Sequence, residues 1–350
     1  MNDALYMNRC FELAQKGAGQ VSPNPMVGAV LVYEGRIIGE GYHEHFGGAH
    51  AEVNCLRSVK PEDAALVAKS ALYVSLEPCN HFGKTPPCTS LILQQRIPEV
   101  VIGCTDPFEK VNGSGVAHLV NHGVKVRTGI LDKEARALNR RFFCFHQQQR
   151  PYIILKWAQT ADGKISGKDN QPLAISHPLT NRLAHRWRSE ESSIMIGTGT
   201  LMSDNPSLTT RLWPGKNPVR VIIDKHLKAA QSLRVFDESA ETLIFNLQLS
   251  QQSGKNVFIK IKQENNLLQE LLQSLQQRSI LSMLVEGGTT TLQHFIQQGL
   301  WDEARVITNQ KMLTGEGREA PVLQGHQLET STIISSDRID YFTNKGSIKI

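Results

Sequence analysis

Short β-rich apolar runs alternate with segments of helical periodicity along this whole sequence. In the first 150 residues the β-rich runs are AVLVYEG, ALYVSL, VVIGC and VKVRTG, and the helical segments span residues 4–16, 51–58, 89–96 and 133–146. After residue 150 the alternation continues with SIMIG, VRVIID, TLIFN, NVFIKI, SMLVEGG and EARVIT as expected strands. Strands that alternate with helices in this way predict α/β layers in both halves of the chain.

One further segment, residues 263–278, carries a stripe of leucines. The stripe consists of Leu267, Leu268, Leu271, Leu272 and Leu275. This spacing is typical of an amphipathic helix, so we expect the leucines to pack into a core.

The chain is expected to form two domains. Its 350 residues exceed the usual size of a single core. All six cysteines lie in the first 150 residues, which indicates a change of character along the chain. Near residue 147 the stretch HQQQRPY follows an expected helix, and Pro151 is suited to end one element and open the next. We therefore expect domains at 1–148 and 151–350.

The composition points to no macromolecular partner. The formal net charge is only +5, and no run of five or six lysines or arginines is present, so we expect no binding of nucleic acid. The first residues, MNDALYMNRCFELAQK, lack the basic start and continuous apolar stretch of a signal peptide. No stretch approaches the roughly 18 consecutive apolar residues that a membrane span needs. A cytoplasmic protein with no membrane association is the expectation.

A possible metal site combines one histidine with two cysteines. His50 and Glu52 stand in GGAHAEVNCL, and Cys79 and Cys88 stand in EPCNHFGKTPPC. One nitrogen and two sulfur ligands fit tetrahedral Zn²⁺ with an open fourth position, where a bound water loses its proton near neutral pH. Glu52 can then carry that proton to a leaving amine. Zinc deaminases combine H-x-E with P-C-x-x-C, so the first half matches here and the second half is longer.

The expected local structure supports this metal site. The run ALYVSLEP is a strand that leads into Cys79, and CTSLILQQ is a helix whose first turn contains Cys88. A thiolate at a helix N-terminus is favoured by the helix dipole and the exposed amides. Two alternatives stay open, namely buried thiols with no ligand and a non-catalytic zinc module in which His81 or Cys55 is a fourth ligand.

The residues between the two cysteines narrow the class of deaminase. His81, Lys84 and Thr85 suit a phosphate group or the polar edge of a heterocycle. Three motifs in order, SPNPMVGAVLV, GYHEHFGGAHAE and EPCNHFGKTPPC, resemble the deaminase domain of the bifunctional riboflavin-biosynthesis deaminase/reductase family. The resemblance implies a cytidine-deaminase-like, three-layer α/β domain.

By the same resemblance, five residues would hold an aminopyrimidine ribotide. They are Asn24, His43, His81, Lys84 and Asp106. Many family members place an asparagine just after the Asp-Pro pair, where this sequence has Phe108, so that contact is not expected here.

The second domain has a different phosphate-binding signal. It lacks GxGxxG after its first strand, and IGTGTLMSDNP matches that fingerprint poorly, which argues against a Rossmann site. In LVEGGTTTLQHF, two glycines and three threonines lie between an expected strand and an expected helix, where amides and hydroxyls can bind phosphates. Glycine pairs after strands are also common as simple turns.

The motifs ILKWAQTADGKI, HRWRSEESSIMIGTGTLMSDNPSLTTR and VEGGTTTL resemble the reductase domain of the same family. The resemblance implies a dihydrofolate-reductase-like α/β fold that uses NADPH. The implied cofactor contacts are Ala158, Thr200, Asp204, Gly288, Thr289, Thr290, Thr291, Leu292, Gln293 and His294. The implied contacts to the sugar-phosphate substrate are Arg188, Leu208, Arg211 and Glu286.

One segment of the second domain departs from the family pattern. Where members commonly carry a serine and a tryptophan, NQPLAISHP has Pro172 and Ala174. The loss of an indole removes a large packing surface near the substrate.

The resemblance therefore implies a bifunctional enzyme that contains one Zn²⁺ and uses NADPH. It would act on a small phosphoribosylaminopyrimidine and form a homo-oligomer. An active deaminase with an altered or inactive reductase is one alternative. A nucleoside or tRNA deaminase with an unrelated second domain is another, although it would require CxxC and, for tRNA, a basic face.

Overall fold

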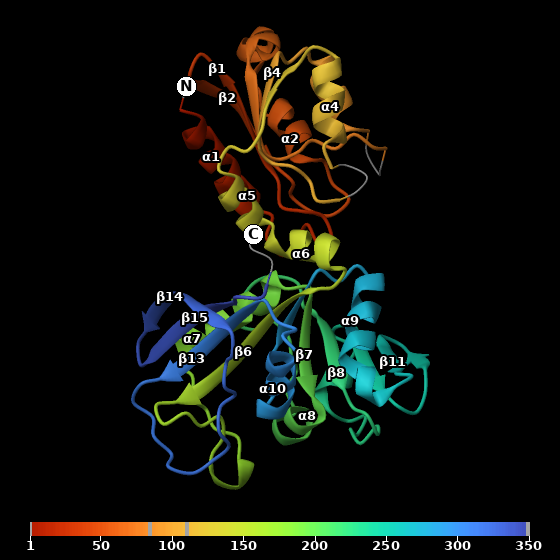
Figure 1. Ribbon diagram of the computed structural model, residues 1–350, viewed down its shortest axis with the longest axis vertical. Helices are drawn as coiled ribbons and strands as arrows, with labels where there is room; N and C mark the ends of the chain where they lie inside the picture. Colours follow the sequence, from red (N-terminus) through yellow and green to blue (C-terminus); the bar gives the residue numbers. More distant parts are fainter. Residues whose placement is uncertain (1, 83–85, 109–111, 348–350) are drawn as a thin grey trace. The chain divides into compact units, whose positions relative to one another are not determined.

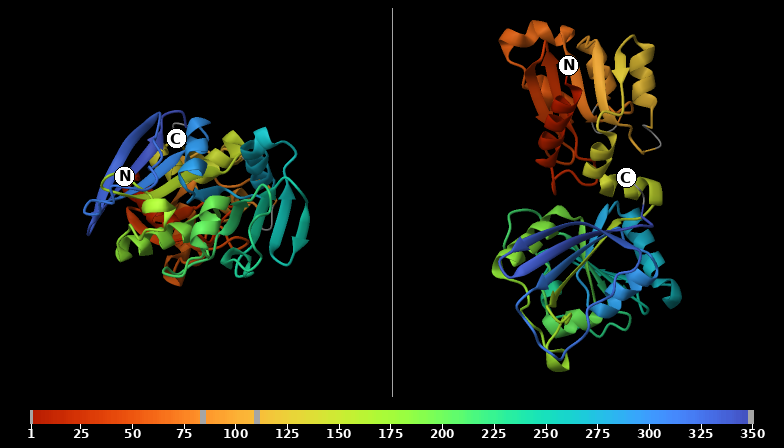
Figure 2. Two further views of the ribbon diagram at one scale, coloured as in Figure 1. Left: turned by 90° about the horizontal axis from the view of Figure 1, so that it is seen from below. Right: turned by 60° about the vertical axis from the view of Figure 1, so that its left-hand side comes forward.

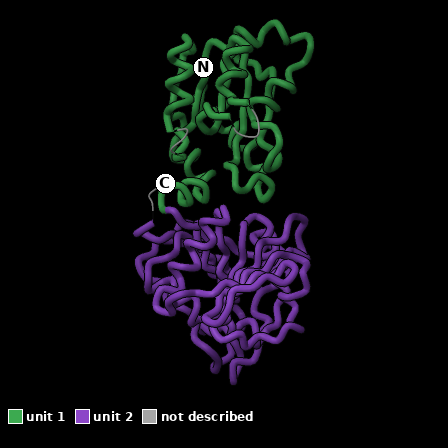
Figure 3. Tube along the Cα trace, turned by 90° about the vertical axis from the view of Figure 1, so that its right-hand side faces the viewer, with its two compact units in different colours: residues 1–148, 350 green, residues 149–349 purple. Residues whose placement is uncertain are grey.

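The computed structural model describes residues 2–82, 86–108 and 112–347, and the chain divides into two compact units. Unit 1 comprises Met1–Gln148 and unit 2 comprises Gln149–Lys349 (Figure 3). Among the described residues, no helix has both the length and the apolar character that crossing a membrane requires. Each unit is built around its own β-sheet (Figure 1).

Unit 1 contains a five-stranded sheet in the order β2-β1-β3-β4-β5. The strands are β1 (Gly28–Tyr33), β2 (Arg36–Tyr42), β3 (Ala71–Leu76), β4 (Glu99–Cys104) and β5 (Lys125–Arg127). β1 is antiparallel to β2 and to β3, whereas β3, β4 and β5 run parallel. The carboxyl ends of β3 and β4 therefore meet at one edge of the sheet.

Helices cover both faces of this sheet. α1 (Asp3–Gln15), α5 (Asp132–Leu138) and α6 (Arg140–Gln148) contribute to one core, and α2 (Ala51–Arg57), α3 (Cys88–Gln94) and α4 (Ser114–Asn121) contribute to the other, with a 3₁₀ segment η1 (Pro61–Lys69) (Figure 1). Along β1, Val30 and Val32 face the α1 side, while Ala29 and Leu31 face the α2 side. This period of two is what a strand buried on both faces requires, and it yields three layers.

The single helix expected at residues 133–146 is wrong, because the structure has two helices that meet at Asn139. The Asn139 side chain accepts a hydrogen bond from Met26 N at 2.8 Å and donates one to Met26 O at 2.9 Å. Asn139 itself has φ −105° and ψ 26°, outside the helical range. The amide thus pairs with backbone far away in the sequence and ends α5.

Unit 2 contains a ten-stranded sheet in the order β10-β11-β9-β8-β7-β12-β6-β13-β15-β14. The strands are β6 (Tyr152–Thr160), β7 (Ser193–Gly197), β8 (Val219–Ile223), β9 (Thr242–Asn246), β10 (Gln251–Ser253), β11 (Asn256–Lys260), β12 (Ser282–Val285), β13 (Glu303–Asn309), β14 (His326–Ile334) and β15 (Asp337–Asn344). Across the sheet, the seven neighbouring strands β11, β9, β8, β7, β12, β6 and β13 are parallel. At the edges of the sheet, β10 is antiparallel to β11, and β15 is antiparallel to both β13 and β14.

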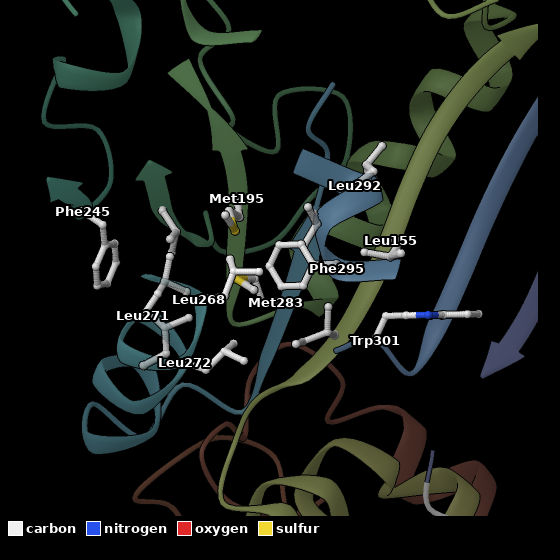
Figure 4. Close-up of a cluster of buried hydrophobic side chains, with 14 of the residues drawn as sticks. Leu155, Met195, Phe245, Leu268, Leu271, Leu272, Met283, Leu292, Phe295 and Trp301 are labelled. Carbon is white, nitrogen blue, oxygen red and sulfur yellow. The ribbon is translucent and has the colours of Figure 1, made fainter. Parts of the chain in front are cut away.

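The helices of unit 2 also lie on both faces of their sheet (Figure 2). They are α7 (Pro178–Glu190), α8 (Thr198–Asp204), α9 (Leu267–Gln277) and α10 (Thr289–Gln297), with short 3₁₀ segments η2 (Lys168–Asn170), η3 (Arg234–Phe236) and η4 (Glu264–Asn266). α9 and α10 pack on β6, β7, β8, β9 and β12 in the main core (Figure 4). All five leucines of the expected stripe are buried in α9, which confirms that prediction. α8 and η3 contribute Leu201 and Val235 to a second core.

The parallel centre of this sheet brings several loops to one edge. β6, β7, β8 and β12 end next to one another; a loop follows β6, β8 and β12, and α8 follows β7 directly. Ligands of open α/β sheets bind outside the carboxyl ends of the strands, so this edge is where a site is expected.

Candidate functional site

In unit 1, the structure brings His50, Cys79 and Cys88 together. His50 is the extended residue immediately before α2, Cys79 follows the end of β3, and Cys88 is the first residue of α3. The His50 Nδ1 atom lies 3.3 Å from Cys88 Sγ and 3.5 Å from Cys79 Sγ. The three potential ligand atoms all lie within 4.8 Å of one another.

These three residues fit one zinc ion. Ligands at about 2.0–2.3 Å around a tetrahedral ion are themselves about 3–4 Å apart, which agrees with the nitrogen–sulfur distances. Within the described part of the chain, the cluster contains only these three residues, and Cys55 lies instead in the hydrophobic core. Three protein ligands leave the fourth position open for a reacting molecule.

Glu52 lies in the first turn of α2 and is only 3% exposed. Burial, followed by the negative charge of Cys79, raises the pKa of the Glu52 carboxyl. A hydrogen bond from the Cys88 thiol lowers the pKa of Cys79 to about 4. The site therefore combines a thiolate with a carboxyl group that can hold and release a proton.

Asn24 and His43 form a chain of contacts that leads to His50. The Asn24 side-chain amide donates to His43 Nε2 at 3.1 Å, and His43 Nδ1 donates to Ala49 O at 2.9 Å, which fixes the tautomer. The rings of His43 and His50 meet edge to face, with centroids 5.5 Å apart. Burial lowers the pKa of His43, so the ring is kept neutral.

His81 and Asp106 come from two further loops. Among the described residues no hydrogen-bond partner meets His81 Nδ1, which is buried. Burial raises the pKa of Asp106 to about 7, and its carboxylate accepts a hydrogen bond from Phe108 N at 2.8 Å. The Phe108 ring meets His81 edge to face, with centroids 6.3 Å apart. Lys84, expected at the same site, lies outside the described residues.

Glu77, which no sequence motif assigned to the site, is only 4% exposed. Its carboxylate accepts hydrogen bonds from four backbone amides, those of Asp106, Gly113, Gly115 and Val116. The only available signal was its position, because it directly precedes the Pro-Cys pair in EPCNHFGKTPPC.

In unit 2, a cavity of about 1330 Å³ opens at the carboxyl edge of the parallel strands. Eight of the residues expected at the reductase site line it, namely Ala158, Thr200, Asp204, Glu286, Gly288, Thr290, Thr291 and His294. Gly288 N donates to Thr200 Oγ1 at 3.0 Å, so α8 and the loop after β12 are joined directly. A volume of this size accommodates a large ligand.

Glycines keep the end of β7 and the loop after β12 close to the start of α10. A Cβ atom at Gly197 would lie 2.7 Å from Thr291 Oγ1, and one at Gly287 would lie 2.9 Å from Thr291 Cβ. Both distances are too short for a side chain, so bare backbone borders the cavity here. Exposed amides and hydroxyls at the start of α10 suit the phosphates of a dinucleotide such as NADPH.

Three other expected cofactor contacts have side chains outside the cavity lining. The Thr289 hydroxyl donates to Glu319 O at 2.6 Å, and the Gln293 amide donates to Val322 O at 3.5 Å. Leu292 is fully buried in the main core. These residues lie on the first turns of α10, and their side chains anchor that helix.

The Arg188 guanidinium binds Glu286 in a bidentate pair. Arg188 Nε and Nη2 each donate to a different carboxylate oxygen at 2.8 Å, and Lys156 Nζ lies 3.6 Å from the same group. Burial raises the pKa of Glu286, but Arg188 and Lys156 oppose it and bring the pKa down to about 2. Lys156 was not expected at the site, although it is the one charged residue in YIILKWA; it lines the cavity.

Arg211 and Leu208 lie in the segment that follows α8. Arg211 Nη1 donates to Thr209 Oγ1 at 3.1 Å, and Leu208 is buried with φ 55°. Burial, together with the charges of Arg188 and Arg211, lowers the pKa of the nearby His185 to about 4. Two guanidinium groups and a neutral imidazole thus lie close together. Of the four expected substrate contacts only Glu286 lines the cavity itself.

Pro172 and Ala174 also line this cavity. The departure from the family pattern therefore lies at the reductase cavity and not on a remote surface.

Comparison with known proteins finds one family match in each unit of the chain. Residues 1–104 match the family described as the cytidine and deoxycytidylate deaminase zinc-binding region, and residues 151–340 match the RibD C-terminal domain. The riboflavin biosynthesis protein RibD of Aquifex aeolicus is 39% identical over 345 residues, which cover 97% of this chain and 95% of the relative. RibD of Escherichia coli is 32% identical and covers 93% and 92%.

Solved structures give the same result. The crystal structure of a diaminohydroxyphosphoribosylaminopyrimidine deaminase/5-amino-6-(5-phosphoribosylamino)uracil reductase from Thermotoga maritima has a TM-score of 0.89 and 35% identity, with 98% of each chain covered. The family and the two fold types expected from the motifs are thus confirmed. The chain belongs to the RibD family of bifunctional enzymes of riboflavin biosynthesis, with a zinc-dependent deaminase domain followed by an NADPH-dependent reductase domain.

Proposed function

We propose that unit 1 deaminates 2,5-diamino-6-(5-phosphoribosylamino)pyrimidin-4-one and that the domain at 151–350 reduces the ribosyl chain of the product to ribityl. The observation that carries this proposal is the presence, in one chain, of the His50, Cys79 and Cys88 cluster and the glycine-lined cavity of unit 2. Each suits one half of the reaction sequence.

In the deaminase, His50, Cys79 and Cys88 would hold the zinc ion. When bound, the ion lowers the pKa of a water molecule towards neutrality and so supplies the nucleophile for the amino-bearing C2 carbon. Glu52 takes a proton from the nucleophile and delivers it to the departing ammonia, a role that suits a buried carboxyl with a raised pKa. The product is a uracil.

Recognition of the pyrimidine ribotide is assigned to Asn24, His43, His81, Lys84 and Asp106. The hydrogen bond between Asn24 and His43 leaves the second Asn24 hydrogen and the amide oxygen for a heterocycle edge. His81 Nδ1, which has no hydrogen-bond partner among the described residues, supports a polar ligand, because buried polar atoms are normally paired.

In the reductase, NADPH supplies the hydride that is transferred to C1′ of the opened ribosyl group. Ala158, Thr200, Asp204 and the segment 288–294 would orient the cofactor. For the segment, the support is the start of α10, where backbone amides and the Thr290 and Thr291 hydroxyls border the cavity.

Binding of the reductase substrate is assigned to Arg188, Leu208, Arg211 and Glu286. Two guanidinium groups suit a phosphomonoester, and a carboxylate with its pKa lowered to about 2 stays ionised for ribose hydroxyls or a developing positive charge. Arg188 binds Glu286, so the pair acts as a unit on the substrate.

A deaminase with an altered reductase is the second candidate, since Pro172 and Ala174 line the cavity in place of the usual serine and tryptophan. One coupled assay decides between the two candidates. The purified chain is given the diaminopyrimidine ribotide, and ammonia release and NADPH oxidation are recorded together. We expect both signals; ammonia without NADPH oxidation identifies the second candidate, and the absence of both signals contradicts the proposal.

We also propose a cytoplasmic homo-oligomer. None of the six cysteines, all of which lie among the described residues, forms a disulfide, as is usual in a reducing compartment. β14 is a nine-residue edge strand with exposed Leu328 and Ile333, and such an edge offers backbone groups for pairing with another chain. Light scattering on the purified protein tests the oligomeric state, and cell fractionation tests the location.

A further inference from the structure

Glu77 connects the zinc-ligand loop to a segment that is remote in sequence. It follows β3 and stands two residues before Cys79. Its Oε2 atom accepts from Asp106 N at 3.2 Å and from Gly113 N at 3.0 Å. Its Oε1 atom accepts from Gly115 N at 3.0 Å and from Val116 N at 3.2 Å. Four acceptor interactions use both oxygens of the carboxylate.

Two of these amides belong to the first turn of α4, where a helix needs an acceptor. The N-cap residue is Gly113, with φ 83°, and it has no side chain to cap the helix. Glu77 therefore provides the cap from another part of the chain and satisfies amides that would otherwise be left without an acceptor. The negative charge also lies at the favourable end of the helix dipole.

The neighbours of Glu77 fix the same arrangement. Asn80 donates from its side chain to Ser114 O at 3.4 Å and accepts from Thr89 Oγ1 in α3 at 2.8 Å. A Cβ atom on Gly115 would lie 2.2 Å from Pro78 O, so α4 starts directly against the backbone of the Pro-Cys pair. The start of α4 is thus held to both sides of Cys79.

We propose that Glu77 is a positioning residue of the deaminase centre, which holds Asp106 at the pyrimidine ribotide through the backbone amides of Asp106 and of the start of α4. This inference rests on the proposed function, because it takes Asp106 to be a substrate contact. Both carboxylate oxygens of Glu77 are turned to backbone amides, so we assign it no direct contact with the substrate. Glu77 affects deamination because it fixes the position of Asp106.

Replacement of Glu77 by glutamine tests the proposal with little change in shape. Whichever way its amide lies, glutamine keeps one acceptor oxygen, so two of the four backbone amides lose their partner. We expect E77Q to raise the KM for the diaminopyrimidine about tenfold or more, since small misplacements of binding groups are costly. The kcat should change less, and the zinc content should stay near one per chain. NADPH oxidation with deaminated substrate should be unchanged.

A double-mutant cycle separates positioning from general support of the fold. In a D106A background, E77Q should have little further effect on KM, because the group that it positions is absent. If the KM increases caused by E77Q and by D106A multiplied in the double variant, the proposal would be overturned. An unchanged KM in either single variant would overturn it as well.

A matched control and a structural measurement complete the test. Asp63 is a buried carboxylate of unit 1 that binds Arg36 at 2.5 Å, so D63N makes the same chemical change away from the site. Amide hydrogen exchange at Asp106, Gly113 and Gly115 should be faster in E77Q and unchanged in D63N; equal exchange rates in both would overturn the role of Glu77.

This exchange comparison needs no turnover, so it decides the role of Glu77 in holding Asp106 even if the unmodified enzyme released no ammonia and the proposed function failed. Should E77Q not fold, E77D carries the same test. It keeps both oxygens one methylene short of the amides, and it is expected to give changes of the same kind. Wild-type KM and exchange in E77D would then overturn the proposal.

Discussion

Arg188 and Glu286 form a bidentate ion pair in which both hydrogen bonds measure 2.8 Å and both side chains are largely buried. The pair joins α7 to the end of β12 and therefore connects the core of unit 2 to its cavity. A charged pair in this position has two consequences, one for stability and one for acid sensitivity.

We expect R188A to destabilise unit 2 by about 3–5 kcal/mol, because removal of one partner leaves the other buried and uncompensated. The matched control is R186A, on the same helix, where Arg186 and Glu190 form an exposed pair. That change should cost less than about 1 kcal/mol. Tryptophan fluorescence during urea unfolding measures both, since all four tryptophans lie in unit 2. If R188A and R186A lost the same free energy of unfolding, burial of the Arg188–Glu286 pair would not matter for stability.

The depressed pKa of Glu286 predicts an acid-sensitive unit 2. The pKa falls from 4.5 to about 2 on folding, since Arg188 and Lys156 outweigh the opposing effect of burial. The stabilisation is therefore fully present above about pH 4.5 and is lost as the pH falls towards 2. The shift corresponds to about 3 kcal/mol.

E286Q checks this window, because glutamine does not titrate. Its free energy of unfolding at pH 7 should be lower than that of the unmodified protein, and the difference between the two should shrink as the pH falls from about 4.5 towards 2. A constant difference over that range would show that Glu286 does not titrate with the shifted pKa.

We expect E52Q to reduce kcat for ammonia release by about 10²–10⁴-fold, because glutamine cannot carry the proton. Zinc content should stay near one per chain, and NADPH oxidation with deaminated substrate should be unchanged. E44Q is the control, since Glu44 is exposed and lies in the same stretch of sequence. Unchanged ammonia release in E52Q would remove Glu52 from the mechanism.

The parts of the fold that depend on local periodicity could be predicted from the sequence. Apolar residues recur every second position in the buried strands and at helical spacing in the leucine stripe of α9. Such periodicity can be recognised in the sequence alone. β14 was missed because eight of its nine residues are exposed, so no apolar alternation marks it. The break between α5 and α6 was missed because it depends on Asn139 and Met26, which are 113 residues apart.

The candidate sites divide in the same way. His50, Cys79 and Cys88 could be found because their residue types and their places at element ends define the chemistry. Glu77 and Lys156 could not be assigned from the sequence, because their roles depend on partners brought together only by the fold. The bidentate pairing of Arg188 with Glu286 was equally invisible, although each residue was expected at the substrate.

The last prediction concerns the hydrogen bond from Gly288 N to Thr200 Oγ1, which measures 3.0 Å and joins α8 to the loop after β12 at the reductase cavity. Valine has the shape of threonine but cannot accept this bond, which leaves the partly buried Gly288 amide without its partner and costs about 1 kcal/mol. T200V should therefore raise the KM for NADPH several-fold, as about 1.4 kcal/mol corresponds to tenfold.

Serine at the same position separates the hydrogen bond from the packing of the threonine methyl group. T200S keeps the acceptor, so its KM for NADPH should remain close to that of the unmodified enzyme, and ammonia release should be unaffected in both variants. Initial rates of NADPH oxidation with deaminated substrate supply the measurement. If T200V and T200S raised KM equally, the methyl group and not the hydroxyl would be the feature that matters, and α8 and the loop after β12 would not depend on this bond to hold the cofactor.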